Sequence, residues 1–455
     1  MSIINTILTN QFFLMFLAIA TGLLLGKIKI KNFSLGISGG IFTGIVIGYI
    51  ATALASGVAE GELGYSNAKR ILSQGVVSQP FFTFFLFLFL ASIGLKVGKN
   101  IGVIFKRYGV RFVVIGAMIP LVSMIVACAA HVLVLENDSS LSAYETIGVF
   151  SGSMTSTPAY GTALDAADNV DVQALYAAAD EEGKAQILHR IDSTDSLSAA
   201  DITTLTEDQI KAYKESSASS VSLGYTVGFP VGVLVIVLMM QFLPPIFRID
   251  VEDEKRRYKE ELETAPQPTK EKKDGPLDFI GFGIVVMIGI AVGNIKIPLG
   301  PLGTFSLGAA GGILLTALIL SNIGKIGPLN FRMDSRALGI LSRMGLTFFM
   351  AIVGLRYGYD VINALTGSGL KLAAAAAVIE AVAVLAAFFV GRKIFHLNWT
   401  ILSGAIAGGC TSAPGLGAAI SVVKDDEPST GYGAAQPFAI LSNVILTTIF
   451  FAIFF

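Results

Sequence analysis

Long apolar segments recur along the whole chain and are separated by short polar or charged stretches. Six of them approach or exceed the roughly 18 apolar residues that indicate a membrane-spanning helix. These segments are 12–26, 81–95, 110–135, 221–243, 372–390 and 438–455. The first has no basic region before it and no cleavage signal, so we expect a span rather than a signal peptide. The pattern predicts an all-α polytopic membrane protein.

Composition supports this class and excludes others. The chain is 53% hydrophobic and 14% charged, whereas a soluble domain carries about 25% charged residues. The formal net charge of −1 offers no basic field to a nucleic-acid partner. The two cysteines, Cys128 and Cys410, cannot make a disulfide framework. The three histidines, His131, His189 and His396, lack metal-ligand spacing, so we expect no metal site and no cofactor.

One phrase is written twice in the chain. Residues 148–163 read GVFSGSMTSTPAYGTA and residues 404–419 read GAIAGGCTSAPGLGAA, with seven identities at a shift of 256. Other blocks match in the same order: 22–30 with 289–297, 34–41 with 306–313, 93–98 with 353–358, 109–111 with 369–371, and 222–234 with 429–441. The ordered matches predict an internal duplication.

The duplication divides the chain into units. The shift falls to 207 in the last block, which places an insertion of 49 residues within 168–220. We therefore expect a first repeat over 1–167, with four spans and one signature segment, followed by an acidic insert outside the membrane over 168–220 that is helical in part near 174–189. A fifth span over 221–247 and a charged linker over 248–275 come next. The second repeat, over 276–455, should contain five spans and a signature segment at 402–423. The mixed-charge linker is interpreted as a connector whose first part forms a solvated helix.

The orientation of the two halves depends on whether the signature segments cross the membrane. If they cross, the halves are parallel; if they dip in and return, the halves are inverted. With returning segments and the N-terminus outside, 23 of the 32 Lys and Arg residues fall inside. A crossing segment would instead place the eight cations of 248–273 outside, against the positive-inside rule. We therefore predict two inverted repeats, each of five transmembrane helices and one re-entrant broken segment, with both termini outside and the linker in the cytoplasm.

The signature residues suit a ligand site. Proline disfavours a helical conformation before it and is welcome in a first turn, so one half-helix should end near Thr155 or Thr411 and another begin at Pro158 or Pro414. Hydroxyl caps and free N–H groups at such a helix start favour an anion. A kinked, packed helix is the alternative for a single copy. The expected substrate-binding residues are Thr155, Ser156, Thr157, Pro158, Thr411, Ser412, Ala413 and Pro414, with Gly152 and Gly408 allowing close approach.

Five further residues are paired or polar positions in the fifth and tenth spans. Tyr225 and Pro230 match Tyr432 and Pro437, and Gln436 adds an amide beside the second proline. These residues are interpreted either as kinks that pack against the broken segments or as part of the site lining. The sequence leaves both interpretations open.

Three charged residues also have two interpretations. Glu380 lies within an apolar run, where a carboxylate is a candidate proton or cation partner; Arg392 or a neighbouring helix could instead satisfy it. Lys96 and Arg356 occupy matching span ends. Such side chains usually extend to the interface, and attraction of an anionic substrate is the second interpretation.

The doubled motifs GxxxGxxTSxPAxGxAL and GxxxGGxTSAPGLGAA resemble those of the aspartate–alanine exchanger family of bacterial transporters. The stretches LLLGKIKIKNFSLG and LPPIFRIDVEDE are also similar to that family. The resemblance implies a secondary carrier of small carboxylates or amino acids, such as aspartate, alanine or succinate, in the bacterial inner membrane, as a homodimer within the lipid bilayer. Many family members carry soluble regulatory domains in the central loop; here the short linker replaces them.

Other classes remain as alternatives. An anion channel needs a continuous polar path, and an ion-coupled carrier of another solute would need sodium or protons as partners. No Ser/His/Asp set, paired carboxylates or HExxH motif lies within the spans, so we expect no enzyme activity. By analogy with other inverted repeats, we expect elevator-like alternating access.

Overall fold

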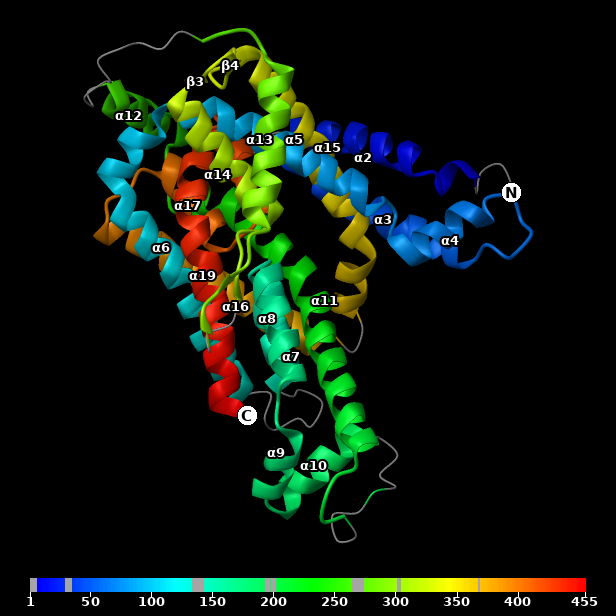
Figure 1. Ribbon diagram of the computed structural model, residues 1–455. Coiled ribbons are helices and arrows are strands. Elements are labelled where there is room, and N and C mark those ends of the chain that lie inside the picture. The colour runs from blue at the N-terminus through cyan, green and yellow to red at the C-terminus, as the bar shows by residue number, and fades with distance from the viewer. Residues whose placement is uncertain are drawn as a thin grey trace.

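The computed structural model describes residues 6–28, 35–132, 143–192, 197, 202–263, 274–300, 304–366 and 369–455. Helices dominate these residues, and seven helices are long and apolar enough to cross a membrane. They are α3 (Gly39–Ser56), α5 (Gln79–Val97), α6 (Ile101–Ala130), α11 (Glu207–Ile246), α15 (Ser335–Thr366), α16 (Leu370–Phe389) and α19 (Pro428–Phe454). The chain is an all-α polytopic membrane protein, as its apolar pattern predicts (Figure 1).

Three of the ten expected spans are shorter apolar helices. They are α2 (Gln11–Lys27), α13 (Phe279–Gly293) and α14 (Gly308–Ile323), of 17, 15 and 16 residues. Side-chain caps begin two of them: Asn10 accepts hydrogen bonds from the first N–H groups of α2, and Asp278 does so for α13. The remaining short elements are α4 (Tyr65–Gln74), the 3₁₀ turns η1 (Gly36–Ser38) and η2 (Gly98–Asn100), the π turn η5 (Val390–Ile394), and the strand pairs β1–β2 (Ile297–Pro298 with Thr304–Phe305) and β3–β4 (Lys325–Ile326 with Leu329–Asn330).

The duplicated phrase forms two broken helices. The first consists of α7 (Ala143–Ser153) and α8 (Thr157–Asp168), and the second of α17 (Trp399–Gly409) and α18 (Ala413–Val423). We call these the first hairpin and the second hairpin. The first lies toward the end of the molecule that carries α9 and α10, and the second lies nearer the end that carries α12 (Figure 1).

Helix contacts recur in matching pairs. α2 packs on α3 as α13 packs on α14; α3 packs on α15 as α14 packs on α5; α6 packs on α19 as α16 packs on α11; and α7 packs on α11 as α17 packs on α19. Matching sequence blocks therefore make matching contacts. The inverted orientation of the two halves stays a prediction.

The same contacts divide the helices into two bundles. α2, α3, α5, α13, α14 and α15 pack mainly against one another and form what we call the first bundle. α6, α11, α16 and α19 pack around both hairpins and form the second bundle. The two bundles share fewer contacts, among them α11 with α15 and α14 with α19.

Glycine allows the hairpins to pack directly on backbone. A Cβ atom added at Gly404 would lie 1.6 Å from the carbonyl oxygen of Pro428 at the start of α19. A Cβ atom at Gly148 would lie 2.2 Å from the carbonyl oxygen of Val221 in α11. Both distances are impossible for a real side chain, so α17 on α19 and α7 on α11 require glycine at these matched positions.

The acidic insert contains two short helices, α9 (Val172–Ala178) and α10 (Glu181–Ile191). Its end is not separate from the next span, because α11 begins at Glu207 and runs without interruption to Ile246. A capping box at Thr206 and Gln209 starts this helix. The Arg190 guanidinium lies over the rings of Tyr144 and Tyr213, which docks the insert onto α7 and α11.

The linker contains α12 (Val251–Glu263), which is docked rather than fully solvated. Its Tyr258 is 0% exposed, and the helix contacts α17 and α18. Sequence alone had suggested a solvated connector, because the eleven residues from Glu252 are mostly charged. Two of these charged residues, Glu254 and Lys259, bind the ends of the second hairpin.

Candidate functional site

The first break lies at Met154–Ser156. Thr155 has φ 48°, the left-handed region that β-branched residues avoid. Its N–H donates to the carbonyl oxygen of Gly152 (2.8 Å), and the N–H of Ser156 donates to that of Ser151 (2.9 Å). These two bonds form a Schellman ending with threonine where glycine is usual. Ser156 then caps α8 by accepting from the N–H of Ala159 (3.4 Å), so the chain turns back as a new helix.

The second break repeats this structure. Thr411 has φ 50°, and its N–H donates to the carbonyl oxygen of Gly408 (3.0 Å). The N–H of Ser412 donates to the carbonyl oxygen of Ala407 (2.9 Å), and the Ser412 hydroxyl accepts from the N–H of Gly415 (3.2 Å). Pro158 and Pro414 both lie in the first turn of the helix that follows.

The two breaks touch each other. The Thr155 hydroxyl donates to the carbonyl oxygen of Cys410 (3.2 Å), and the Thr411 hydroxyl donates to the carbonyl oxygen of Met154 (2.6 Å). Each threonine thus binds the carbonyl one residue before its counterpart. The arrangement joins two segments that lie about half the chain apart.

The candidate residues differ in what they can offer a ligand. Thr157 is exposed, and Thr155, Pro158, Thr411 and Ala413 are half-buried. The side chains of Ser156 and Ser412 are buried, and their hydroxyls already cap helices. Pro414 is buried. Gly152 and Gly408 are packing positions, because an added Cβ atom would lie 2.7 Å and 2.5 Å from the carbonyl oxygens of Tyr225 and Tyr432.

The supporting residues fall into two groups. Tyr225 lies against the first break: its hydroxyl is 3.4 Å from that of Thr157, and its ring stacks on Tyr160 at 4.2 Å. Gln436 is turned to its own helix, where its amide donates to the Tyr432 hydroxyl (3.0 Å). Pro230 and Pro437 lie inside α11 and α19, and both helices continue through them.

Glu380 lies beside the second break. Its side chain is 0% exposed and lies next to the thiol of Cys410. Neither carboxylate oxygen has a hydrogen-bond partner of normal geometry among the described residues. Arg392 does not pair with it; the Arg392 guanidinium binds Glu254 at 2.8 Å and 2.9 Å. Of the two partners for Glu380 that the sequence allowed, Arg392 is therefore excluded in this structure.

Ion pairs hold the second hairpin at the α12 end. Glu254 accepts from the Arg392 guanidinium and from the N–H of Trp399 (2.7 Å), where the hairpin begins. Lys259 pairs with Asp425, just after the hairpin ends, at 3.2 Å. Burial acts to raise the pKa of Asp425, but the charge and hydrogen bond of Lys259, the N–H of Asp426 and the charge of Lys255 together hold the pKa below its ordinary value.

Neighbouring acids stand in a different environment. Lys96, at the end of α5, pairs with Asp426. Burial, joined by the negative charges of Asp425 and Asp426, raises the pKa of Glu427 to about 7. The Glu427 Oε2 atom is buried and has no hydrogen-bond partner among the described residues.

Sequence reasoning overlooked the residues that complete the contact between the breaks. Met154 and Cys410 precede the two matched threonines and supply the carbonyl oxygens. Their equal positions in the two phrases were a usable signal. Tyr160 stacks on Tyr225, and nothing in the sequence places these two rings together, because they lie on different helices.

Comparison with known proteins agrees with this architecture. The family model described as a predicted permease membrane region, Asp-Al_Ex, matches residues 14–245 and 281–452. An uncharacterized transporter of Bacteroides thetaiotaomicron is 36% identical over 174 residues, which are 38% of this chain and 33% of that protein. One from Geobacter sulfurreducens is 36% identical over 174 residues, 38% of this chain and 32% of that protein. One from Corynebacterium diphtheriae is 31% identical over 177 residues, 38% and 31% respectively.

These alignments span about a third of the length of each of those relatives. The family model covers far more of this chain: both matched ranges together include the two hairpins and all the long apolar helices. The chain belongs to the aspartate–alanine exchanger family of membrane transporters.

Proposed function

We propose that this protein is a secondary active transporter that exchanges small carboxylates or amino acids across the bacterial inner membrane. Aspartate, alanine and dicarboxylates such as succinate are the candidate substrates. The observation that carries the proposal is the contact between the two hairpins, each with a strained threonine donating to the other break. Strain of this kind concentrates at functional sites.

The hairpin tips offer a carboxylate the groups that it needs. Thr157 supplies an exposed hydroxyl. Thr155 and Thr411 are half-buried at the tips and donate their own O–H groups across the contact, and each tip begins a helix whose dipole favours negative charge. Ser156 and Ser412 position those helix starts by capping them. Pro158, Ala413 and Pro414 set their direction, while Gly152 and Gly408 hold the hairpins close to α11 and α19.

The division into two bundles supports a proposal for alternating access. In our proposal the second bundle, which contains both hairpins, moves against the first in an elevator-like step, and the two halves are inverted repeats. The matched helix contacts and the location of the hairpins support this arrangement. The first bundle would form a homodimer in the lipid bilayer, with the linker in the cytoplasm and both termini outside. Glu380 is then the candidate for coupling to H⁺ or Na⁺, because it is buried beside the moving tip.

Two alternatives predict different transport behaviour. An anion channel would conduct in proportion to concentration, and a carrier coupled to an ion would need that ion's gradient. The closed contact between the breaks disfavours an open pore in this conformation.

Counterflow in proteoliposomes separates these functions. Vesicles loaded with unlabelled aspartate, alanine or succinate should take up the labelled compound faster than empty vesicles, and uptake should saturate. Flux that is linear with concentration and indifferent to the internal solute would refute exchange. Uptake that appears only with a proton or sodium gradient would support the coupled carrier.

A further inference from the structure

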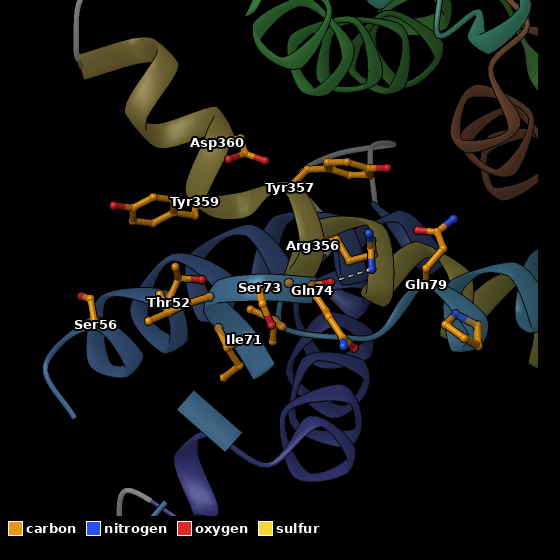
Figure 2. A pocket seen from close by; sticks show the side chains of 14 residues that line it. Thr52, Ser56, Ile71, Ser73, Gln74, Gln79, Arg356, Tyr357, Tyr359 and Asp360 are labelled. Atoms are coloured by element: carbon orange, nitrogen blue, oxygen red, sulfur yellow. Dashed lines mark hydrogen bonds between the residues drawn. The ribbon is translucent and has the colours of Figure 1, made fainter. Parts of the chain in front are cut away.

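A cavity of about 800 Å³, with both polar and apolar groups in its walls, lies away from the two breaks, between α3, α4, the start of α5 and α15 (Figure 2). Its walls carry hydroxyl and amide groups from Thr52, Ser56, Gln74 and Gln79. One cation and one anion also line it, Arg356 and Asp360, which both come from α15. A volume of this size fits a small organic solute.

The guanidinium of Arg356 is held by backbone carbonyl groups and by neighbouring aromatic residues, among them Tyr357. Its Nη1 atom donates to the carbonyl oxygens of Gln74 (3.3 Å) and Val77, and the group lies 5.7 Å from the ring centre of Phe82. The Nε atom is buried and has no hydrogen-bond partner among the described residues. A guanidinium fixed in the wall of a cavity is suited to a carboxylate.

Asp360 lies one helical turn further along the same helix. It is half-buried, and Arg356 is the charge that acts on it. None of the ion pairs formed by the described residues includes its carboxylate. Even partial burial of a carboxylate without a partner has a cost, and an ammonium group would relieve that cost. Residues i and i+4 share a helix face, so the two charges form one site.

The matching cation in the other half is occupied. Lys96 corresponds to Arg356 in the duplicated sequence, and Lys96 pairs with Asp426. The cation in the cavity has no acid partner at ion-pair distance among the described residues. The two ends of the molecule therefore differ: one has a closed ion pair, the other an open cavity with a cation in its wall.

A series of rings leads from this cavity to the first break. Tyr357, which lines the cavity, packs on Phe229 (5.0 Å between ring centres), and Phe229 packs on Tyr225 (5.5 Å). Tyr225 stacks on Tyr160 and lies beside Thr157. The cavity and the hairpin tip are thus connected through one continuous aromatic contact path.

We propose that the cavity is an outer binding site for a small zwitterion, with Arg356 holding its carboxylate and Asp360 its ammonium group. The inference rests on the proposed transport function, and it assigns a site distinct from the hairpin tips. In the predicted orientation this end of the molecule faces outward, so the site would collect substrate before transfer. A zwitterionic lipid headgroup has related chemistry, and the test below distinguishes it.

Isothermal titration calorimetry on the full-length protein in nanodiscs without phosphatidylethanolamine tests the site. The probes are L-alanine, which carries both charges, succinate, which lacks the ammonium group, and phosphoethanolamine as the headgroup. Asp360→Asn should weaken alanine binding about tenfold and leave succinate within about twofold. Arg356→Gln should weaken both. Asp360→Glu should restore part of the alanine affinity. Glu62→Gln serves as the matched charge control, because it removes the charge of an exposed acid that does not line the cavity.

Three results would overturn the assignment: no alanine binding by the wild-type protein at millimolar concentration, equal effects of Asp360→Asn on alanine and succinate, or Arg356-dependent binding of phosphoethanolamine alone. Thermal unfolding of each variant excludes misfolding as the cause. The proposed transport function fails separately. If counterflow is absent while alanine binding depends on both charges, the cavity site is supported and the exchange function is refuted. If counterflow is normal and neither substitution changes alanine binding, the exchange function is supported and the cavity site is refuted.

Discussion

At the scale of single residues, Thr155 and Thr411 hold the break geometry at a cost. Both occupy the left-handed region at φ 48° and 50°, which glycine would adopt without strain. The hydroxyl explains the choice, since each one donates to the opposite break. Glycine would fit the backbone but could not form this contact.

Substitution of Thr411 separates the hydroxyl from the backbone. Thr411→Val keeps the β-branch and removes the donor, so uptake in counterflow should fall about tenfold or more. Thr411→Ser keeps the donor and should transport close to wild type. Thr155→Ala and Thr411→Ala should likewise lower uptake more than they lower the melting temperature. Uptake at the wild-type rate in Thr411→Val would contradict a role for this hydroxyl.

Glu427 should make stability depend on pH. Its pKa is raised from 4.5 to about 7 in the folded protein, so the folded state retains its proton while the unfolded state loses it. The free energy of unfolding should therefore fall by about 1 to 3 kcal/mol as pH rises from 4.5 to 7. Above pH 7 this contribution should stay constant.

The matched variant is Glu427→Gln, which cannot ionise. We expect it to melt at a higher temperature than wild type at pH 8 and at a similar temperature at pH 4.5, measured by thermal unfolding in detergent. A constant difference across this range would show that Glu427 ionises normally.

At the scale of elements, the close approach of hairpin and long helix depends on glycine. Gly404→Ala would place Cβ 1.6 Å from the Pro428 carbonyl oxygen, so α17 and α19 must separate. We expect a loss of about 1 to 3 kcal/mol in stability. Gly161→Ala is the control, because a Cβ atom there meets nothing within 4 Å. Equal melting temperatures for both variants would rule out the tight contact.

The linker helix α12 should depend on Glu254 for its docking. This carboxylate binds the Arg392 guanidinium and the N–H of Trp399. Glu254→Gln removes the charge from a half-buried pair, which costs about 1 to 3 kcal/mol locally. Amide hydrogen exchange should therefore become faster across Val251–Glu263. Glu252→Gln, an exposed residue on the same helix, should leave exchange unchanged; the reverse order would contradict the docking role.

At the scale of the whole molecule, the ion pair between Lys96 and Asp426 joins the two bundles. Lys96 ends α5 in the first bundle, and Asp426 lies between α18 and α19 in the second. If the bundles slide past each other, this contact must open in each cycle. A tether between the two positions should therefore stop exchange.

Cross-linking tests this motion. In a variant with Cys128 and Cys410 replaced by Ala, Lys96→Cys and Asp426→Cys should react with a short cleavable dithiol reagent. Uptake should stop on cross-linking and return after reduction. Each single-cysteine variant should keep its uptake after the same treatment. Normal uptake by the fully cross-linked protein would exclude relative motion at this point.

Local sequence patterns were sufficient to predict the membrane class, the duplicated blocks and the two breaks. Long apolar runs, repeated phrases and the S/T-x-P pattern are local properties, and the helix ends at Ser153 and Gly409 follow from residues within one turn of them. Charge counting also favoured re-entrant segments, because the positive-inside rule depends only on loop composition.

The contacts between distant groups, in contrast, become visible only in the folded chain. The bonds of Thr155 to Cys410 and Thr411 to Met154 join residues more than 250 positions apart, and no local pattern encodes such a pairing. The docking of α12 is a second example. Its charged sequence predicts a solvated helix, but Glu254 and Lys259 bind the two ends of the second hairpin. The cavity at Arg356 and Asp360 likewise exists because α3, α4 and α15 pack around it. Partners of buried polar groups are set by packing between distant segments, and that packing is a property of the folded chain.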